Sequence, residues 1–285
     1  MPDPFADVPR ELKQGRYRLV AAIGTGGAAE VWRAKDKKTG RSCAIKVLHK
    51  GADSEVSSRF LAEAKVMNAL QHPRIVNVFD VGRDEGWYWF AMDIHPHSLR
   101  DRIADGPVPP LTALKWTHQL LAGLAAAHAR GVIHRDVKPA NVLINTGEHV
   151  VLADFGVARH RPEDVPHRTM GGAFLGSFGY AAPEQRKSAR DVTPQADLYS
   201  VGAVLYAMVT GNNPADLALP ETVESTLRPL TPELRDIVQK ACAYEPTLRY
   251  TSADAMAADV EAAWIRSGGK GALVAKPRGC LFGWF

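Results

Sequence analysis

The chain has 285 residues, 46% of them hydrophobic and 23% charged, and its formal net charge is +4. This length suits a single unit with a substantial core, and so small a net charge gives no reason to expect a nucleic-acid partner. The three cysteines, Cys43, Cys242 and Cys280, lack C-x-x-C spacing, which argues against disulfides or zinc and favours a reducing compartment. Because there is no apolar run of about 18 residues and no apolar core near the start, we expect a cytoplasmic protein without a signal peptide or a transmembrane segment.

A glycine-rich loop is predicted after a polar lead of residues 1–16. Apolar stretches at residues 17–23 and 31–34 predict two strands that flank Gly24-Thr25-Gly26-Gly27-Ala28-Ala29. Glycines let backbone N–H groups turn toward phosphate oxygens, so the loop favours a nucleotide cover. Ala29 stands where the third glycine of G-x-G-x-x-G-x-V would be.

The next strand carries a lysine among apolar residues, in Ala44-Ile45-Lys46-Val47. A lysine at a strand edge usually keeps its ammonium in water, but these neighbours indicate a buried strand and therefore a charged partner. Glu63 is the natural candidate, at the edge of the apolar face of a helix predicted over residues 57–70. That face consists of Phe60, Ala64, Met67 and Leu70.

The most informative stretch is His134-Arg135-Asp136-Val137-Lys138-Pro139-Ala140-Asn141, followed by Asp154-Phe155-Gly156. It supplies a proton acceptor, a cation and oxygen ligands for Mg²⁺, which are the groups that phosphoryl transfer needs. The alternative for Asp136 is a loop aspartate that only satisfies backbone N–H groups.

Several further motifs follow in order, and together they resemble one family. They are His72-Pro73-Arg74-Ile75-Val76, Ala182-Pro183-Glu184, Asp197-Leu198-Tyr199-Ser200-Val201-Gly202, and Arg249 in Glu245-Pro246-Thr247-Leu248-Arg249-Tyr250. From about residue 17 to 265 the chain resembles the bacterial, eukaryotic-like serine/threonine protein kinases.

The resemblance implies an α+β, bilobal fold with a small β-rich N-lobe containing one helix and a larger, mostly helical C-lobe. We expect an N-terminal extension at 1–16, a kinase domain at 17–267 with lobes at 17–93 and 97–267, and a basic and aromatic tail at 268–285. Helices are predicted near 111–130 and 195–209, the second apolar nearly all round and therefore buried.

The resemblance also implies roles for the site residues, with ATP and Mg²⁺, or Mn²⁺ in its place, as cofactors. Asp136 would take the proton of the acceptor hydroxyl, Lys138 would neutralise the γ-phosphate, and Lys46 with Glu63 would hold the α- and β-phosphates. Asn141 and Asp154 would bind the metal. The other nucleotide contacts would come from Ile23, Gly24, Gly26, Gly27, Val31, Ala44, Met92, Asp93 and Ile94. A scaffold between the lobes would consist of His134, Phe155, Met67 and Val78.

A regulatory site is expected between Asp154 and Glu184, where Thr169 and Ser177 are the Ser/Thr residues. Ser177 matches a peptide-positioning loop, so Thr169 remains as the phosphorylation site that Arg135 would bind. The alternative is an exposed threonine in a loop. Glu184 would pair with Arg249.

The expected function is transfer of phosphate from ATP to Ser/Thr residues of proteins, including this one. The alternatives are a pseudokinase scaffold and a small-molecule phosphotransferase. The segment from Pro214 to Thr231 is short, with room for little more than a short helix, so the docking of protein substrates should be reduced or altered.

The tail carries Lys270, Lys276 and Arg278 before Leu281, Phe282, Trp284 and Phe285. It could pack on the kinase domain, dock a partner or rest on an anionic membrane. We favour packing or docking, because three cations and one short apolar run give marginal bilayer affinity.

Overall fold

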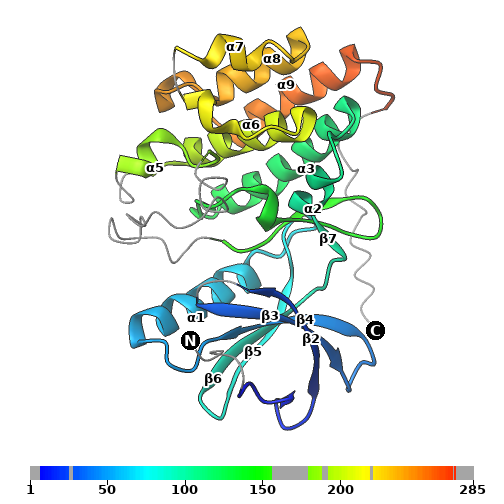
Figure 1. The fold of residues 1–285 in the computed structure, drawn as a ribbon, viewed down its shortest axis with the longest axis vertical. Helices are drawn as coiled ribbons and strands as arrows, with labels where there is room; N and C mark the ends of the chain where they lie inside the picture. Colours follow the sequence, from blue (N-terminus) through cyan, green and yellow to red (C-terminus); the bar gives the residue numbers. More distant parts are fainter. Residues whose placement is uncertain are drawn as a thin grey trace, which may run out of the picture.

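The computed structural model describes residues 7–25, 28–155, 179–187, 192–218, 221–271 and 273. These residues form a small lobe built on a sheet and a larger helical lobe, joined near residues 93–97 (Figure 1). The predicted α+β bilobal fold is confirmed.

In the described residues, the small lobe contains a six-stranded antiparallel sheet in the order β1-β2-β3-β4-β6-β5. Its strands are β1 (Glu11–Leu12), β2 (Tyr17–Thr25), β3 (Ala29–Asp36), β4 (Ser42–Leu48), β5 (Val78–Asp84) and β6 (Trp87–Met92). Side chains alternate between two faces. One face buries a cluster that includes Tyr17, Trp87 and Trp89, and the other faces α1 and the large lobe.

The predicted N-terminal extension contributes to this sheet. Leu12 in β1 is fully buried and pairs with Tyr17 in β2. Arg16 donates to Asp36 at 2.9 Å and to Asp80 at 3.2 Å, and the Tyr17 hydroxyl donates to Asp80 at 2.6 Å. The small lobe therefore begins before residue 17. The sequence did not show this, because a two-residue strand gives no periodic pattern.

Helix α1 (Ser54–Ala69) packs on the sheet and confirms the predicted helix, although it starts earlier. Asp53 is its N-cap and accepts a hydrogen bond from the Val56 N–H at 2.8 Å. Phe60, Ala64, Met67 and Leu70 are buried, as the predicted apolar face required, and Glu63 at the edge of this face is buried too.

The large lobe is organised around α6, whose residues are buried on nearly every side, and α3 and α9 pack together beside it (Figure 1). In its described residues, the helices are α2 (Leu99–Ala104), α3 (Pro110–His128), α5 (Pro183–Lys187), α6 (Pro194–Thr210), α7 (Val223–Leu227), α8 (Pro232–Ala241) and α9 (Ala253–Arg266). Its short 3-10 helices are η1 (Pro139–Asn141), η3 (Pro214–Ala218) and η4 (Pro246–Leu248). A Cβ atom at Gly202 of α6 would lie 2.6 Å from the Ala241 Cβ atom, so α6 and α8 approach closely only because of this glycine.

A second sheet carries the segments of the site. In the described chain it has three strands in the order β7-β8-β9, namely β7 (His97–Ser98), β8 (Val142–Ile144) and β9 (Val150–Leu152). Asn141 immediately precedes β8 and Asp154 follows β9, so this antiparallel pair brings both residues to one end.

The short connection after Pro214 holds only η3 and the five-residue α7 in its described part, as the sequence predicted. Among the residues with described positions, no helix combines the length and the apolar character needed to cross a bilayer.

Candidate functional site

Lys46 forms ion pairs with one residue from each lobe. Its Nζ atom lies 2.8 Å from Glu63 Oε1 on α1 and 3.0 Å from Asp154 Oδ1 in the large lobe. The Lys46 and Glu63 side chains are 14% and 10% exposed, whereas that of Asp154 is 39% exposed. The predicted ion pair of Lys46 and Glu63 is therefore present, and the Asp154 carboxylate stays accessible from the space between the lobes.

Electrostatics keep this cluster charged. Burial by itself would lower the pKa of Lys46, but the Asp154 and Glu63 carboxylates outweigh it and raise the pKa. Burial would raise the pKa of Asp154, yet the Lys46 ammonium holds it below its ordinary value. Burial dominates at Glu63 and raises its pKa despite the lysine. Lys46 and Asp154 are thus ionised at neutral pH, and Glu63 is the member that protonates first as the pH falls.

A second cluster forms in the loop that enters η1. Lys138 Nζ lies 3.0 Å from Asp136 Oδ2, and the Asn141 side-chain nitrogen donates to the same oxygen at 2.9 Å. Asn141 also donates to the Asp136 carbonyl at 2.9 Å. These bonds fix the Asp136 carboxylate and leave the amide oxygen of Asn141 as the atom able to meet a cation.

The buried carboxylate of Asp197, at the start of α6, fixes the backbone of this loop. It accepts hydrogen bonds from the backbone N–H groups of His134 and Arg135, both at 2.8 Å, and contacts His128 Nε2 at 2.8 Å. Arg135 has a φ of 65°, in the left-handed region that disfavours residues other than glycine. Sequence reasoning used Asp197 only as a helix-start motif and missed this role. The available signal was an aspartate in the first turn of an otherwise apolar helix.

His134 is structural and neutral. Complete burial lowers its pKa. Its Nε2 atom lies 3.0 Å from the Ala153 carbonyl and must donate to it, while Nδ1 accepts from the Asp136 N–H at 3.3 Å. The ring also stacks on Phe155, with centroids 4.4 Å apart.

The predicted scaffold residues Met67, Val78 and Phe155 belong to the same buried cluster. That cluster runs through both lobes, so the lobes share one continuous core beside the site. Asp154, which precedes Phe155, has a φ of 54°.

The predicted nucleotide contacts lie along β2, β3, β4 and β6. Ala44 pairs with Met92, and Val31 pairs with Lys46, so these side chains share the sheet face that looks toward the large lobe. The remaining described members are Ile23, Gly24, Asp93 and Ile94, whereas Gly26 and Gly27 lie outside the described residues. The Asp93 N–H already donates to the Asn77 carbonyl at 3.1 Å, so of its two backbone groups Asp93 can offer a ligand only the carbonyl.

Arg249 anchors the segment that begins with Ala182-Pro183-Glu184. Its guanidinium is fully buried and bonds both oxygens of Glu184, at 2.7 and 2.8 Å. On the same segment, Gln185 Nε2 donates to the Arg135 carbonyl at 2.9 Å. The predicted Glu184–Arg249 pair is present, and Gln185, which sequence reasoning missed, connects it to the loop of Asp136.

Thr169, Ser177 and Gly156 lie outside the described residues. The structure therefore brings together Lys46, Glu63, Asp136, Lys138, Asn141 and Asp154, and leaves the expectations for Thr169 and Ser177 untested.

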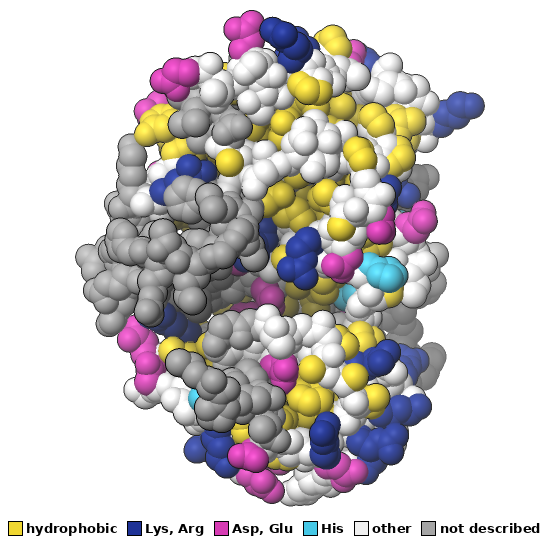
Figure 2. Space-filling model, viewed as in Figure 1, with side chains coloured by type: hydrophobic (Ala, Val, Ile, Leu, Met, Phe, Trp, Pro, Cys, Tyr) yellow, Lys and Arg dark blue, Asp and Glu magenta, His cyan; other side chains and the backbone are white. Residues whose placement is uncertain are grey.

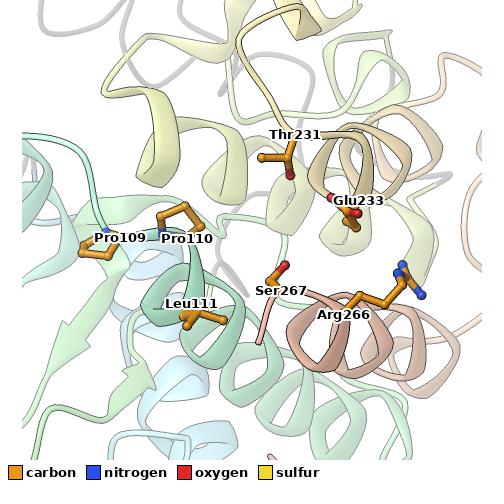
Figure 3. Close-up of a pocket in the computed structure, with 7 residues that line it drawn as sticks. All are labelled: Pro109, Pro110, Leu111, Thr231, Glu233, Arg266 and Ser267. Carbon is orange, nitrogen blue, oxygen red and sulfur yellow. The ribbon is translucent and has the colours of Figure 1, made fainter. Parts of the chain in front are cut away.

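Two hollows can be described on the part of the chain that the structure describes. Figure 2 shows one between the lobes, with acidic side chains inside it. The other is a cavity of about 490 Å³ at the outer end of the large lobe, between the start of α3, the start of α8 and the end of α9 (Figure 3). It is lined by Pro109, Pro110, Leu111, Thr231, Glu233, Arg266 and Ser267, none of them a predicted site residue.

The fold and the charged clusters define a bilobal phosphotransferase site, and comparison with known proteins identifies its family. Residues 17–260 match the family model described as protein kinase domain. A probable serine/threonine-protein kinase of Streptomyces coelicolor is 36% identical over 274 residues, covering 89% of this chain and 40% of that protein. PrkC of Bacillus subtilis is 34% identical, covering 88% and 41%, and PknL of Mycobacterium tuberculosis is 34% identical, covering 88% and 66%. The chain belongs to the protein kinase family, and it spans about two fifths of the length of the first two relatives.

Proposed function

We propose that this chain transfers the γ-phosphate of ATP to serine and threonine hydroxyls of proteins, including its own. The observation that carries the proposal is the convergence of two charged clusters. Lys46, Glu63 and Asp154 form one, and Asp136, Lys138 and Asn141 form the other. The relatives named above are serine/threonine kinases, which supports the same acceptor class.

Each side chain has a task in this proposal. Asp136, fixed by Lys138 and Asn141, orients the acceptor hydroxyl and accepts its proton. Lys138 offsets negative charge beside the transferred group. Lys46 binds phosphate oxygens and is held in place by Glu63.

Asp154 and Asn141 fit a small divalent cation, because both present oxygen near the same end of β8 and β9. Such a cation, Mg²⁺ or Mn²⁺, would neutralise charge on the phosphates when bound. The contact of Lys46 with Asp154 positions this carboxylate before any ligand arrives.

The two alternative functions fit the geometry less well. A pseudokinase would not need the Asp136 carboxylate fixed by two donors beside an intact Lys46–Glu63 pair. A small-molecule phosphotransferase would not need the Glu184–Arg249 anchor, which holds the end of a segment that resembles a peptide-positioning loop.

The test is to incubate the purified chain with Mg-ATP and to map phosphorylated residues by mass spectrometry. We expect phosphoserine or phosphothreonine, with Thr169 among the sites, and no phosphate on Lys46→Met. Transfer by Lys46→Met at the parent rate would contradict the proposal, as would a parent that binds nucleotide but phosphorylates no residue.

For the tail we propose packing on the large lobe. Gly268 and Gly271 have φ values of 89° and 83°, and the Leu273 N–H donates to Glu261 Oε1 of α9 at 3.2 Å. The chain thus turns back along α9 after its end. Deleting residues 268–285 should lower the melting temperature. Unchanged stability with loss of a co-purifying protein would instead indicate docking, and tail-dependent binding to anionic vesicles would indicate a membrane role.

A further inference from the structure

Three cations share one exposed face of the small-lobe sheet. Arg18 on β2 and Arg33 and Lys35 on β3 are all exposed, and Arg18 lies directly opposite Lys35 in the antiparallel pair. We call these three residues the basic face. Like charges directly opposite each other destabilise a sheet, so folding alone does not favour this arrangement.

The basic face lacks neutralising partners within the described part of the chain. No carboxylate there lies within ion-pair distance of Arg18, Arg33 or Lys35. Glu11, which lies on β1 directly opposite Arg18, forms an ion pair with Lys37 at 2.5 Å. Lys38 and Arg41, in the adjoining turn, are also exposed. Figure 2 shows Lys and Arg side chains gathered at the lower right of the small lobe, where Figure 1 places the end of β3 and the start of β4.

The strand register shows on which side of the sheet the basic face lies. Arg33 pairs with Ala44 and Lys35 with Ser42, whereas Val31 pairs with Lys46 two positions along. The basic face is therefore the outward continuation of the sheet face whose Lys46 reaches Asp154 in the large lobe. A ligand there would lie beside the predicted nucleotide contacts without covering Asp136.

We propose that the basic face docks an extended, Asp/Glu-rich segment of a protein substrate. Arg33 and Lys35 stand two residues apart on one strand, roughly 7 Å, which matches acidic side chains at alternate positions of an extended chain. A single phosphate would require cations that converge on one point.

Other occupants fit less well. A second copy would bring like charges together, and the chain's own tail has Lys270, Lys276 and Arg278 but no acidic residue. A flat membrane laid on this face would meet the large lobe, toward which Lys46 points.

The proposal rests on the proposed kinase function. It gives a substrate-docking role to the small lobe in a chain whose usual docking region is reduced to η3 and the short α7.

The direct test is binding of a fluorescent peptide of alternating Glu and Gly to the full chain, measured by anisotropy and independent of catalysis. The variant Arg18→Thr/Arg33→Thr/Lys35→Thr should bind about 10-fold more weakly, the size expected for three exposed ion pairs. The matched control neutralises Lys65, Arg100 and Arg266, which are exposed elsewhere, and should bind like the parent. Raising the salt from about 0.1 M to about 1 M should weaken binding by the parent, because the screening length falls from roughly 10 Å to 3 Å.

A kinetic test connects docking to substrate choice. A threonine peptide extended by the Glu-Gly segment should have a lower KM than one extended by Gln-Gly, with kcat unchanged, and the triple variant should lose this difference. If neither peptide is phosphorylated, the proposed function fails, while the anisotropy result still decides the docking site. Equal binding by parent and triple variant would overturn the proposal. So would face-dependent binding to vesicles with about 30% phosphatidylserine in place of the peptide.

The melting temperature of the triple variant separates docking from a structural role. It should equal or exceed that of the parent, because opposed like charges are removed. A lower melting temperature with unchanged peptide binding would show that these cations serve the fold.

Discussion

Arg135 and Asp154 both hold left-handed backbone conformations in the site, with φ values of 65° and 54°. Such conformations cost roughly 1–3 kcal/mol each and persist only where the surroundings enforce them. At Arg135 the enforcing groups are the Asp197 carboxylate on its N–H and Gln185 on its carbonyl. The side chain of Asp154 is held by Lys46.

At the same scale, Glu63→Gln should lower kcat/KM by roughly 10- to 100-fold, the loss expected when a positioning contact is weakened. The neutral amide no longer holds the Lys46 ammonium as firmly. The pKa of Glu63 is raised from 4.5 by burial, so the activity of the parent should fall with acid at a pH above 4.5. Initial rates across pH should show this acid limb in the parent, and in the variant the fall in rate should move to lower pH.

The control for this prediction is Glu55→Gln, on the exposed side of the same helix. It should keep both the rate and the acid limb of the parent. An acid limb that persists unchanged in Glu63→Gln would assign the titration to another group.

Motif spacing was most informative about contacts between individual side chains. Lys46, Glu63, Asp136, Lys138, Asn141 and Asp154 meet as the sequence indicated. The hydrogen bond from the Asp93 N–H to the Asn77 carbonyl could not be predicted, since it depends on how β5 and β6 are joined to the connection between the lobes.

At the scale of elements, Arg249 anchors the segment of α5 to the C-terminal part of the large lobe. Arg249 bonds Glu184 and also donates to the carbonyls of Ala243, Tyr244 and Gln195 at 2.7, 3.0 and 3.2 Å. A fully buried guanidinium that bonds a carboxylate and three carbonyls uses the planar arrangement of donors that only arginine has.

Arg249→Lys should therefore lower the free energy of unfolding by roughly 1–3 kcal/mol, because lysine keeps the charge but leaves buried carbonyl acceptors without a donor. Urea denaturation measures this loss, and the exposed Arg266→Lys, which should be neutral, is the control. A change below about 0.5 kcal/mol in Arg249→Lys, typical of surface positions, would mean that the buried pair contributes little.

Elements with strong periodicity were predictable and short ones were not. The patterns at 57–70, 111–130 and 195–209 correspond to α1, α3 and α6. By contrast, β1 has two residues, and its place at the sheet edge depends on the remote pairing of Leu12 with Tyr17. The basic face was equally hidden, because only the β2–β3 register sets Arg18 against Lys35.

For the whole molecule, burial lowers the pKa of several histidines below the ordinary value of 6.5. They are His72, His95, His118, His134 and His149. In each case the unfolded chain binds a proton more readily than the folded chain, so stability is lost as the pH falls below about 6.5.

The free energy of unfolding should thus fall by more than about 1 kcal/mol between pH 7 and pH 5.5. Glu63 and Asp93 act in the opposite sense, because burial raises their pKa above 4.5 and 3.8, but they are two groups against five histidines. Chemical denaturation at several pH values measures the slope. A flat or rising stability over this range would contradict the lowered pKa values of these five histidines.

The central claim is that Asp136 accepts the proton of a Ser/Thr hydroxyl beside a nucleotide held by Lys46. The most direct measurement is phosphate transfer from Mg-ATP by Asp136→Asn, with nucleotide binding measured in parallel and Asp254→Asn, an exposed position, as control. The account predicts unchanged nucleotide affinity and a turnover lowered by roughly 10²- to 10⁴-fold. Transfer by Asp136→Asn at the rate of the parent would contradict it.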